Sequence, residues 1–185
     1  RHPARDRARI VVDFDIVLLA QGDKYGDEYA SRMVGMLRKH LSASAPLTLF
    51  TDRERAVPSE VRQVSTVGWD ADGWFGKLKL FDRNILASPF FFLDISTVVL
   101  RDLSPLVEFW KAHEECPLIA MRDWNYDCFG SMVLLVRPNE VTQGIWDAYA
   151  SGKRYQPQTA IDGDQDFIDG YLREHPEFPV MYLPE

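Results

Sequence analysis

The segment FFFLDISTVVLRDLSPL, residues 90–106, places a fully apolar run directly before a single acidic residue. The run at 90–93 follows Pro89 and contains no polar residue, which is typical of a strand buried on both faces in the middle of a parallel sheet. Asp94 then follows at the carboxyl end of this predicted strand. Because open α/β sheets bind ligands at the carboxyl ends of their strands, we expect Asp94 to lie in a binding site.

The chain is long enough and apolar enough to form one domain without disulfides or a structural metal. It has 185 residues, of which 46% are hydrophobic, and a chain of this size buries a sizeable core. We therefore expect residues 1–185 to form a single domain, with a flexible stretch at 1–10. The sequence ends abruptly in MYLPE, which is compatible with a truncated C-terminal part.

The charge and the cysteine content favour a soluble, cytoplasmic protein. The net charge of −7, from 21 basic and 28 acidic residues, argues against general binding to nucleic acid or anionic lipid. Cys116 and Cys128 are too few for a disulfide framework and form no CxxC motif, so a reducing compartment is favoured and no zinc site is encoded. The basic stretch at 1–10 leads into only a short apolar run at 16–20, which predicts neither a signal peptide nor a transmembrane segment.

The apolar residues alternate between strand-like and helix-like spacing in the first half of the chain. Strands are predicted at 15–22, 46–52 and 61–67. A helix is predicted at 26–41, and its buried face is expected to contain Tyr29, Met33, Leu37 and Leu41. A second helix is predicted at 76–86, and its buried side is expected to contain Leu78, Phe81 and Ile85.

The second half of the chain continues this alternation. A helix is predicted at 103–113, with Asp102 as its N-cap and Pro105 in its first turn. Its inward side is expected to contain Leu103, Leu106, Val107 and Trp110. Further strands are predicted at 116–123 and 130–138, further helices at 139–150 and 163–175, and a loop at 151–163. This alternation predicts an α/β fold, a Rossmann-like and mostly parallel sheet with helices on both faces.

The common phosphate-binding and nucleophile motifs are missing from the sequence. No GxGxxG follows the first predicted strand, and neither GxxxxGK[ST] nor GxSxG occurs. Acidic and polar residues instead follow the predicted strands, and Lys77 lies in the segment WFGKLKLF at 74–81. Carboxylates at strand ends are typical of sites that bind a divalent cation or a polar substrate.

The order of four segments resembles a known enzyme family. WFGKLKLF, FFFLDISTVVLRDLSPL, FGSMVLLVRPNE and GDQDFI follow one another between residues 16 and 175. This order is similar to that of GT-A fold, nucleotide-sugar-dependent glycosyltransferases, specifically the glycogenin-like and lipopolysaccharide-galactosyltransferase-like retaining enzymes and their bacterial relatives, here with a degenerate DxD motif. The resemblance implies a single-domain GT-A fold. It also implies transfer of a hexose from a nucleotide diphosphate sugar, with UDP favoured, to a carbohydrate, lipid or protein acceptor with retention of configuration.

The resemblance further implies a divalent cation, Mn²⁺ or Mg²⁺, which offsets the negative charge that builds on the leaving diphosphate. In the family, the two aspartates of the DxD motif and a later histidine hold this ion. Asp94 matches the first aspartate, and Ser96, a neutral and weaker ligand, stands at the position of the second. His175 lies earlier than the family histidine, so we assign it no role. The positions of the other three histidines also do not match that of the family's metal-binding histidine: His2, His40 and His113.

Other site residues are also assigned through the resemblance. Lys77 matches a lysine that faces the donor diphosphate, and Ser131 matches a serine of the family's later strand motif. Asp164 and Gln165 match a DQ pair near the transferred sugar, where they are the candidate catalytic residues. The residues after the first strand, where the family binds the base and ribose, are Gln21, Gly22 and Tyr25.

Each assignment has a purely structural alternative. Lys77 is alternatively a surface lysine on an amphipathic helix, and Tyr25 alternatively packs on its own helix. Asp94 is alternatively a cap or a partner of Arg101 or Lys77 in a buried ion pair, and Asp164 is alternatively a helix N-cap. Three tryptophans could stack on a sugar ring or could simply occupy core and rim positions: Trp69, Trp74 and Trp124.

Two other functions remain open at this point. The replacement of the second DxD aspartate by Ser96 is compatible with an inactive relative that acts as a nucleotide-binding, sugar-binding or scaffold module. A nucleotidyltransferase shares the α/β plan, but it requires a glycine- and arginine-rich loop after the first strand. The sequence LLAQGDKYGDE lacks such a loop, so this alternative ranks last.

Overall fold

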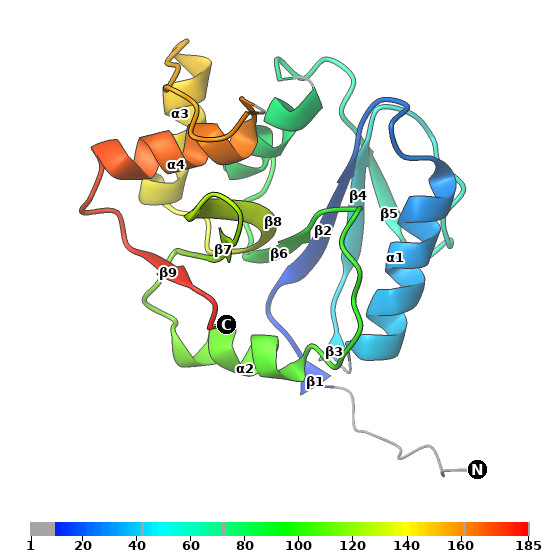
Figure 1. The fold of residues 1–185 in the computed structure, drawn as a ribbon. Coiled ribbons are helices and arrows are strands. Elements are labelled where there is room, and N and C mark those ends of the chain that lie inside the picture. The colour runs from blue at the N-terminus through cyan, green and yellow to red at the C-terminus, as the bar shows by residue number, and fades with distance from the viewer. Residues whose placement is uncertain (1–9, 42, 72, 161, 185) are drawn as a thin grey trace.

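Strands and helices alternate along the chain and build one α/β domain around a central sheet (Figure 1). The computed structural model describes residues 10–41, 43–71, 73–160 and 162–184. The strands of the main sheet are β2 (Asp15–Ala20), β4 (Leu47–Thr51), β5 (Arg62–Ser65), β6 (Phe90–Leu93), β7 (Leu118–Asp123), β8 (Cys128–Val136) and β9 (Val180–Tyr182). The helices are α1 (Asp27–His40), the 3₁₀ helix η1 (Gly73–Phe81), α2 (Ser104–Ala112), α3 (Glu140–Ala150) and α4 (Asp164–Glu174).

The main sheet is mostly parallel and has the strand order β5-β4-β2-β6-β8-β7-β9. Only β8 runs antiparallel to its two neighbours among the described strands of this sheet. The carboxyl ends of β2, β4, β6 and β7 therefore meet at one edge, which we call the carboxyl edge. This arrangement places Gln21, Asp52, Asp94 and Asp123 at the same edge of the molecule.

The apolar run at 90–93 forms β6 in the middle of the sheet, as predicted. All four residues are buried, with β2 parallel on one side and β8 antiparallel on the other. Phe91 stacks on Phe14 with ring centroids 3.7 Å apart and meets Trp110 edge-on at 5.2 Å. Burying one such side chain stabilises the fold by about 1.5–3 kcal/mol, so β6 anchors the core.

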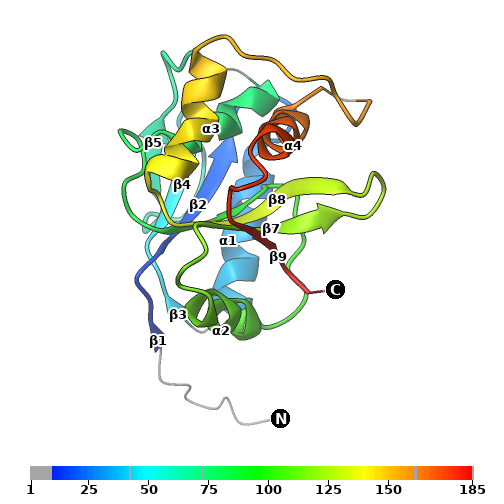
Figure 2. The same ribbon diagram turned by 90° about the vertical axis from the view of Figure 1, so that its left-hand side faces the viewer.

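The two faces of the sheet are covered by different helices, which confirms the predicted architecture (Figures 1 and 2). Because side chains alternate along a strand, Phe91 and Leu93 pack with α1 and α2, whereas Phe90 and Phe92 pack with η1, α3 and α4. Within the described residues, none of the helices combines the length and the apolar character needed to cross a membrane.

Two predictions about the first half of the chain are wrong in detail. Tyr29 is exposed and packs on Tyr25, because the buried face of α1 is formed by Ala30, Met33, Val34 and Leu37. The helix predicted at 76–86 is the 3₁₀ helix η1 and ends at Phe81. It ends there because the Asp82 carboxylate accepts hydrogen bonds from the backbone and side chain of Asn84, a turn that competes with helical pairing.

The cap predicted for the next helix is also displaced. The N-cap residue of α2 is Leu103, not Asp102, and no side chain caps it. The Asp102 carboxylate instead accepts the N–H and O–H of Ser104, so it still satisfies a donor of the first turn.

Three short strands were not predicted. β9 adds to β7 at the sheet edge, and β1 (Ile10–Val11) pairs with β3 (Ala43–Ser44). The predicted loop at 151–163 contains no helix or strand in its described residues. Residues 1–9 of the predicted flexible stretch lie outside the described residues.

Candidate functional site

A buried lysine is surrounded by three polar side chains from distant parts of the sequence. Lys77 Nζ lies 2.8 Å from Asp164 Oδ2 and 3.6 Å from Asp94 Oδ2, and it donates a hydrogen bond of 2.9 Å to Ser131 Oγ. These residues come from η1, the end of β6, β8 and the first turn of α4. We call this group, Lys77, Asp94, Ser131 and Asp164, the Lys77 cluster.

The interpretation of Lys77 as a surface lysine is wrong. Only 6% of the residue is exposed, and its ammonium lies 5.2 Å from the centroid of the Phe92 ring. A buried ammonium is costly unless charged and hydrogen-bonding groups surround it. The two carboxylates and the serine hydroxyl supply those groups and hold the lysine in one orientation.

Asp94 is the solvent-accessible carboxylate of the cluster. Its side chain is 28% exposed. Its Oδ1 accepts the N–H and the O–H of Ser96 at 3.1 and 2.9 Å, while its Oδ2 faces Lys77. Asp94 therefore caps its own turn and pairs with Lys77, which are the two structural roles predicted as its alternative. Its exposed part also remains accessible to a ligand.

Asp164 does not act as the N-cap of α4. The N-cap residue is Gly163, with no side-chain cap, and Asp164 is the first residue of the helix. Its carboxylate is directed at Lys77 and is almost fully buried. The helix N-terminus and the ammonium both favour a negative charge at this position.

Gln165 lies beside the cluster but binds other residues. Its Nε2 donates to Asp123 Oδ2 at 2.9 Å and to Cys128 Sγ at 3.5 Å. Burial acts to raise the pKa of Asp123, but the bond from Gln165 and backbone N–H donors outweigh it and lower that pKa. Burial raises the pKa of Cys128, so its thiol stays protonated at neutral pH.

The residues after β2 form a rigid loop next to the cluster. Gly22 has a φ of 68°, in the left-handed region that glycine tolerates best, and its N–H donates to Asp52 Oδ2 at 2.8 Å. Tyr25 lies in the loop before α1 and packs on Tyr29 of that helix, as the structural alternative predicted. Gln21 packs so closely against Gly76 that a Cβ there would lie 2.0 Å from its Oε1.

Arg55 holds this loop in place, and sequence reasoning missed it. Its guanidinium is fully buried and donates to the carbonyl oxygens of Ala20, Gly22 and Tyr25. Nothing in the segment TDRER indicates this role. Asp52 and Asp123 could have been found, since each closes a predicted strand as Asp94 does.

The Lys77 cluster does not form a complete metal site by itself. Within the described ranges, no three His, Cys, Asp or Glu side chains gather closely enough to hold a metal ion. The protein ligands on offer are one accessible carboxylate, Asp94, and the Ser96 hydroxyl that donates to it. Mg²⁺ is commonly bound by one or two carboxylates together with substrate phosphates. These residues therefore fit a cation that is shared with a bound diphosphate, and they do not fit a cation held by protein alone.

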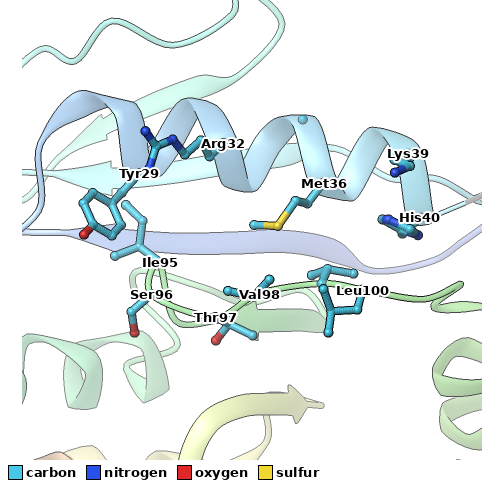
Figure 3. A pocket seen from close by; sticks show the side chains of 12 residues that line it. Tyr29, Arg32, Met36, Lys39, His40, Ile95, Ser96, Thr97, Val98 and Leu100 are labelled. Atoms are coloured by element: carbon cyan, nitrogen blue, oxygen red, sulfur yellow. The ribbon is translucent and has the colours of Figure 1, made fainter.

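An apolar groove is lined in part by Ser96, whose hydroxyl donates to Asp94 of the Lys77 cluster (Figure 3). It has a volume of about 540 Å³ and lies between α1 and residues 95–100. Val98 and Leu100, which are 64% and 77% exposed, form part of its wall. Arg32 and Lys39 of α1 lie along the opposite wall.

Comparison with known proteins is informative only at the level of structure, because no protein-family model and no curated protein sequence matches the chain. The glycosyltransferase GlyE of Streptococcus pneumoniae TIGR4 matches with a TM-score of 0.60 and 16% identity over 93% of this chain and 45% of its own. Mouse xyloside xylosyltransferase 1 matches with a TM-score of 0.58 and 12% identity over 94% and 85% of the two chains.

A Bacillus anthracis protein described as a glucose-1-phosphate thymidylyltransferase matches with a TM-score of 0.51 and 11% identity over 92% and 86% of the two chains. The present chain thus spans less than half of GlyE but most of the other two proteins. Likenesses at such low identity concern the fold. The chain has a GT-A-like fold, with the Lys77 cluster at the carboxyl edge of its sheet.

Proposed function

We propose that this chain is a glycosyltransferase that binds a nucleotide diphosphate sugar, with UDP as the favoured nucleotide, at the Lys77 cluster. The observation that carries the proposal is the buried Lys77 ammonium, held by Asp94, Asp164 and Ser131 at the carboxyl edge of a GT-A-like sheet. Three segments that are far apart in sequence each direct a side chain at this one lysine, which a surface ion pair would not require. The carboxyl edge is also where open α/β sheets bind their ligands.

The parts of the donor are assigned by position along the edge. Lys77 faces the diphosphate, and Asp94 is the carboxylate that a ligand reaches first. Gln21, Gly22 and Tyr25 lie at the end of the neighbouring strand β2, where they contact the base and ribose. The buried Oε1 of Gln21 has no hydrogen-bond partner among the described residues. An unpaired acceptor of this kind costs about 1–3 kcal/mol and is commonly explained by a functional contact.

The charge of the cluster favours a cation alongside the donor. One ammonium and two carboxylates sum to −1, which repels a diphosphate. Mn²⁺ or Mg²⁺ would be held by Asp94 and Ser96 together with the diphosphate oxygens. When bound, such an ion offsets the negative charge on the leaving nucleotide.

The protein residues contribute mainly by electrostatics and positioning. Bond cleavage at the sugar builds negative charge on the phosphate oxygens, and a lysine already fixed by three partners stabilises that charge without reorganisation. Asp164 keeps Lys77 oriented, and Gln165, held by Asp123, borders the sugar. The bond from the sugar to the diphosphate breaks while the acceptor oxygen bonds to the same carbon from the same face, which retains the configuration. A phosphate oxygen of the leaving group takes the proton of the acceptor hydroxyl, so no separate enzymic base is needed.

The inactive alternative rests on one observation, the serine in place of the second DxD aspartate. It predicts weak nucleotide binding and no turnover with any donor. Calorimetry with UDP, GDP and their sugars, with and without Mn²⁺, separates the two functions. We expect UDP to bind, with affinity raised about tenfold or more by Mn²⁺, and UDP-sugar to release UDP in a coupled assay.

Matched aspartate variants make this test specific. Asp94→Asn should lose the effect of Mn²⁺ on UDP binding and should lose turnover, while it keeps the fold. Asp13→Asn, an exposed position outside the carboxyl edge, is the control and should behave as the unmodified protein. Binding of no nucleotide under any condition would contradict the proposal, and UDP binding without turnover would favour the inactive relative.

A further inference from the structure

We propose that the β7–β8 turn, residues 123–127 with the sequence DWNYD, is the platform that binds a pyranose ring of a carbohydrate acceptor. The inference rests on the proposed function and deepens it, because it selects carbohydrate among the open acceptor classes. It is carried by a separate group of residues, none of which belongs to the Lys77 cluster.

Two aromatic side chains of this turn are unusually exposed. Trp124 is 73% exposed and Tyr126 is 46% exposed, although large aromatic side chains are highly buried on average. The flat face of an aromatic ring suits the apolar C–H face of a pyranose, and its burial on binding removes apolar area from water.

The turn is held rigid before any ligand arrives. Asp123 Oδ1 accepts the N–H groups of Asn125 and Tyr126 at 2.8 and 3.2 Å, and the N–H of Asp127 donates to the Asp123 carbonyl at 3.1 Å. Asp127 itself adopts a φ of 48°. Preorganised loops lose less conformational entropy on binding, so their aromatic groups contribute more to affinity.

The turn is tied to the Lys77 cluster through α4. Gln165 donates to Asp123 Oδ2 at 2.9 Å, and the residue before it, Asp164, is the partner of Lys77 at 2.8 Å. Figure 2 shows the β7–β8 hairpin extending beyond the rest of the sheet near α4. The base of the turn is therefore joined to the Lys77 cluster through two consecutive residues of α4.

Polar groups for sugar hydroxyls alternate with the two aromatics. Asn125 and Asp127 are exposed, and amide and carboxylate side chains accept and donate the hydrogen bonds that hydroxyl groups need. The groove next to Ser96 differs in this respect. None of its lining residues is Asp, Glu, Asn or Gln, so it offers a saccharide no carboxylate or amide group.

The test measures saccharide binding and nucleotide binding separately. Saturation-transfer NMR would be recorded with maltose, lactose, cellobiose and chitobiose in the presence of UDP and diamagnetic Mg²⁺, for the unmodified chain and for Trp124→Ala, Trp124→Phe and Leu100→Ser. Calorimetry with UDP accompanies each variant, and circular dichroism checks its fold. Leu100→Ser is the control, because it changes an equally exposed apolar side chain in the groove.

We expect at least one disaccharide to bind, with an affinity about tenfold lower in Trp124→Ala. Trp124→Phe and Leu100→Ser should stay within about threefold of the unmodified chain, and UDP binding should be unchanged in all variants. The inference is overturned if UDP binds but no disaccharide does, or if Trp124→Ala binds saccharide as well as the unmodified chain. Failure of UDP to bind in the unmodified chain is a different result, which contradicts the proposed function itself.

Discussion

Replacing Lys77 by methionine tests whether the cluster is a buried, interdependent set of charges. Methionine keeps the unbranched length of the side chain but removes the ammonium 2.8 Å from Asp164. With an effective dielectric constant of about 20, a pair at this distance attracts by roughly 6 kcal/mol. Removing one member of a buried pair commonly costs about 3–5 kcal/mol. Since Lys77 and Asp164 are both almost fully buried, we expect Lys77→Met to lose about 3–5 kcal/mol of unfolding free energy at about pH 8.

The pH dependence of this loss has a definite sign. An unpaired buried carboxylate takes up a proton more readily than a paired one, and the native state then binds more protons than the unfolded state. The variant should therefore recover stability relative to the unmodified protein as the pH falls from about 8 to about 5. Adding Asp164→Asn should also recover part of the loss, with a coupling energy of about 2 kcal/mol in the double-mutant cycle.

Urea unfolding followed by circular dichroism at both pH values measures these quantities. Lys39→Met, at an exposed position of α1, is the matched control and should change stability by no more than about 0.5 kcal/mol. A loss below about 1 kcal/mol for Lys77→Met, or a loss that grows as the pH falls, would refute the buried-cluster reasoning.

Three further predictions concern other positions. Asp94→Asn should weaken UDP binding in the presence of Mn²⁺ by about tenfold while changing the melting temperature little, because Asp94 is partly exposed; equal binding by calorimetry would count against a role for its charge. Gly76→Ala should displace Gln21, whose Oε1 lies 2.0 Å from the added Cβ, and should lower UDP affinity at a stability cost of about 1 kcal/mol; unchanged affinity would remove Gln21 from the site. Asp166→Asn should lower the unfolding free energy by about 1.5–3 kcal/mol, because the Asp166 carboxylate accepts the N–H groups of Gln158 and Thr159. Burial acts to raise the pKa of Asp166, but these hydrogen bonds outweigh it and lower the pKa. The contribution of Asp166 to the unfolding free energy is therefore complete above about pH 4 and is lost as the pH falls further. If the variant remained less stable than the unmodified protein by the same amount in acid, this reasoning would be contradicted.

The sheet could be predicted because its signals are local. The run at 90–93 is apolar throughout and is bounded by Pro89 and Asp94, which is typical of a short strand covered on both faces. The aspartate that follows such a strand must lie at the sheet edge, so the position of Asp94 follows from chain direction alone. Periodicity also located α1, although Tyr29 matched the spacing of its buried face and is exposed in the structure.

The interior of the cluster could not be predicted in the same way. Lys77 lies in a segment whose spacing fits an amphipathic helix, and its burial depends on three residues that lie 17, 54 and 87 positions further along the chain. Nothing local distinguishes a lysine that is covered by such partners from one that faces water. The 3₁₀ geometry of η1 and the support of the β2 loop by Arg55 depend on tertiary contacts in the same manner.

The acidic residue Asp164 shows where a local rule gives the wrong structural role. An aspartate at the predicted start of a helix is a favourable N-cap, yet Gly163 occupies the cap and the carboxylate pairs with Lys77. A charged partner outcompeted backbone capping at this position. The departure from the local rule is itself a reason to treat Asp164 as part of a site.

The central claim is that the donor diphosphate binds at the Lys77 cluster, against the Lys77 ammonium and beside the accessible carboxylate of Asp94. A crystal structure of the chain with UDP and Mn²⁺ tests it most directly. We predict density for the diphosphate at the carboxyl edge between β2 and β6, with phosphate oxygens in contact with the Lys77 ammonium and the cation against Asp94. Nucleotide density at any other place on the molecule, with the Lys77 cluster unchanged and without ligand, would contradict the account.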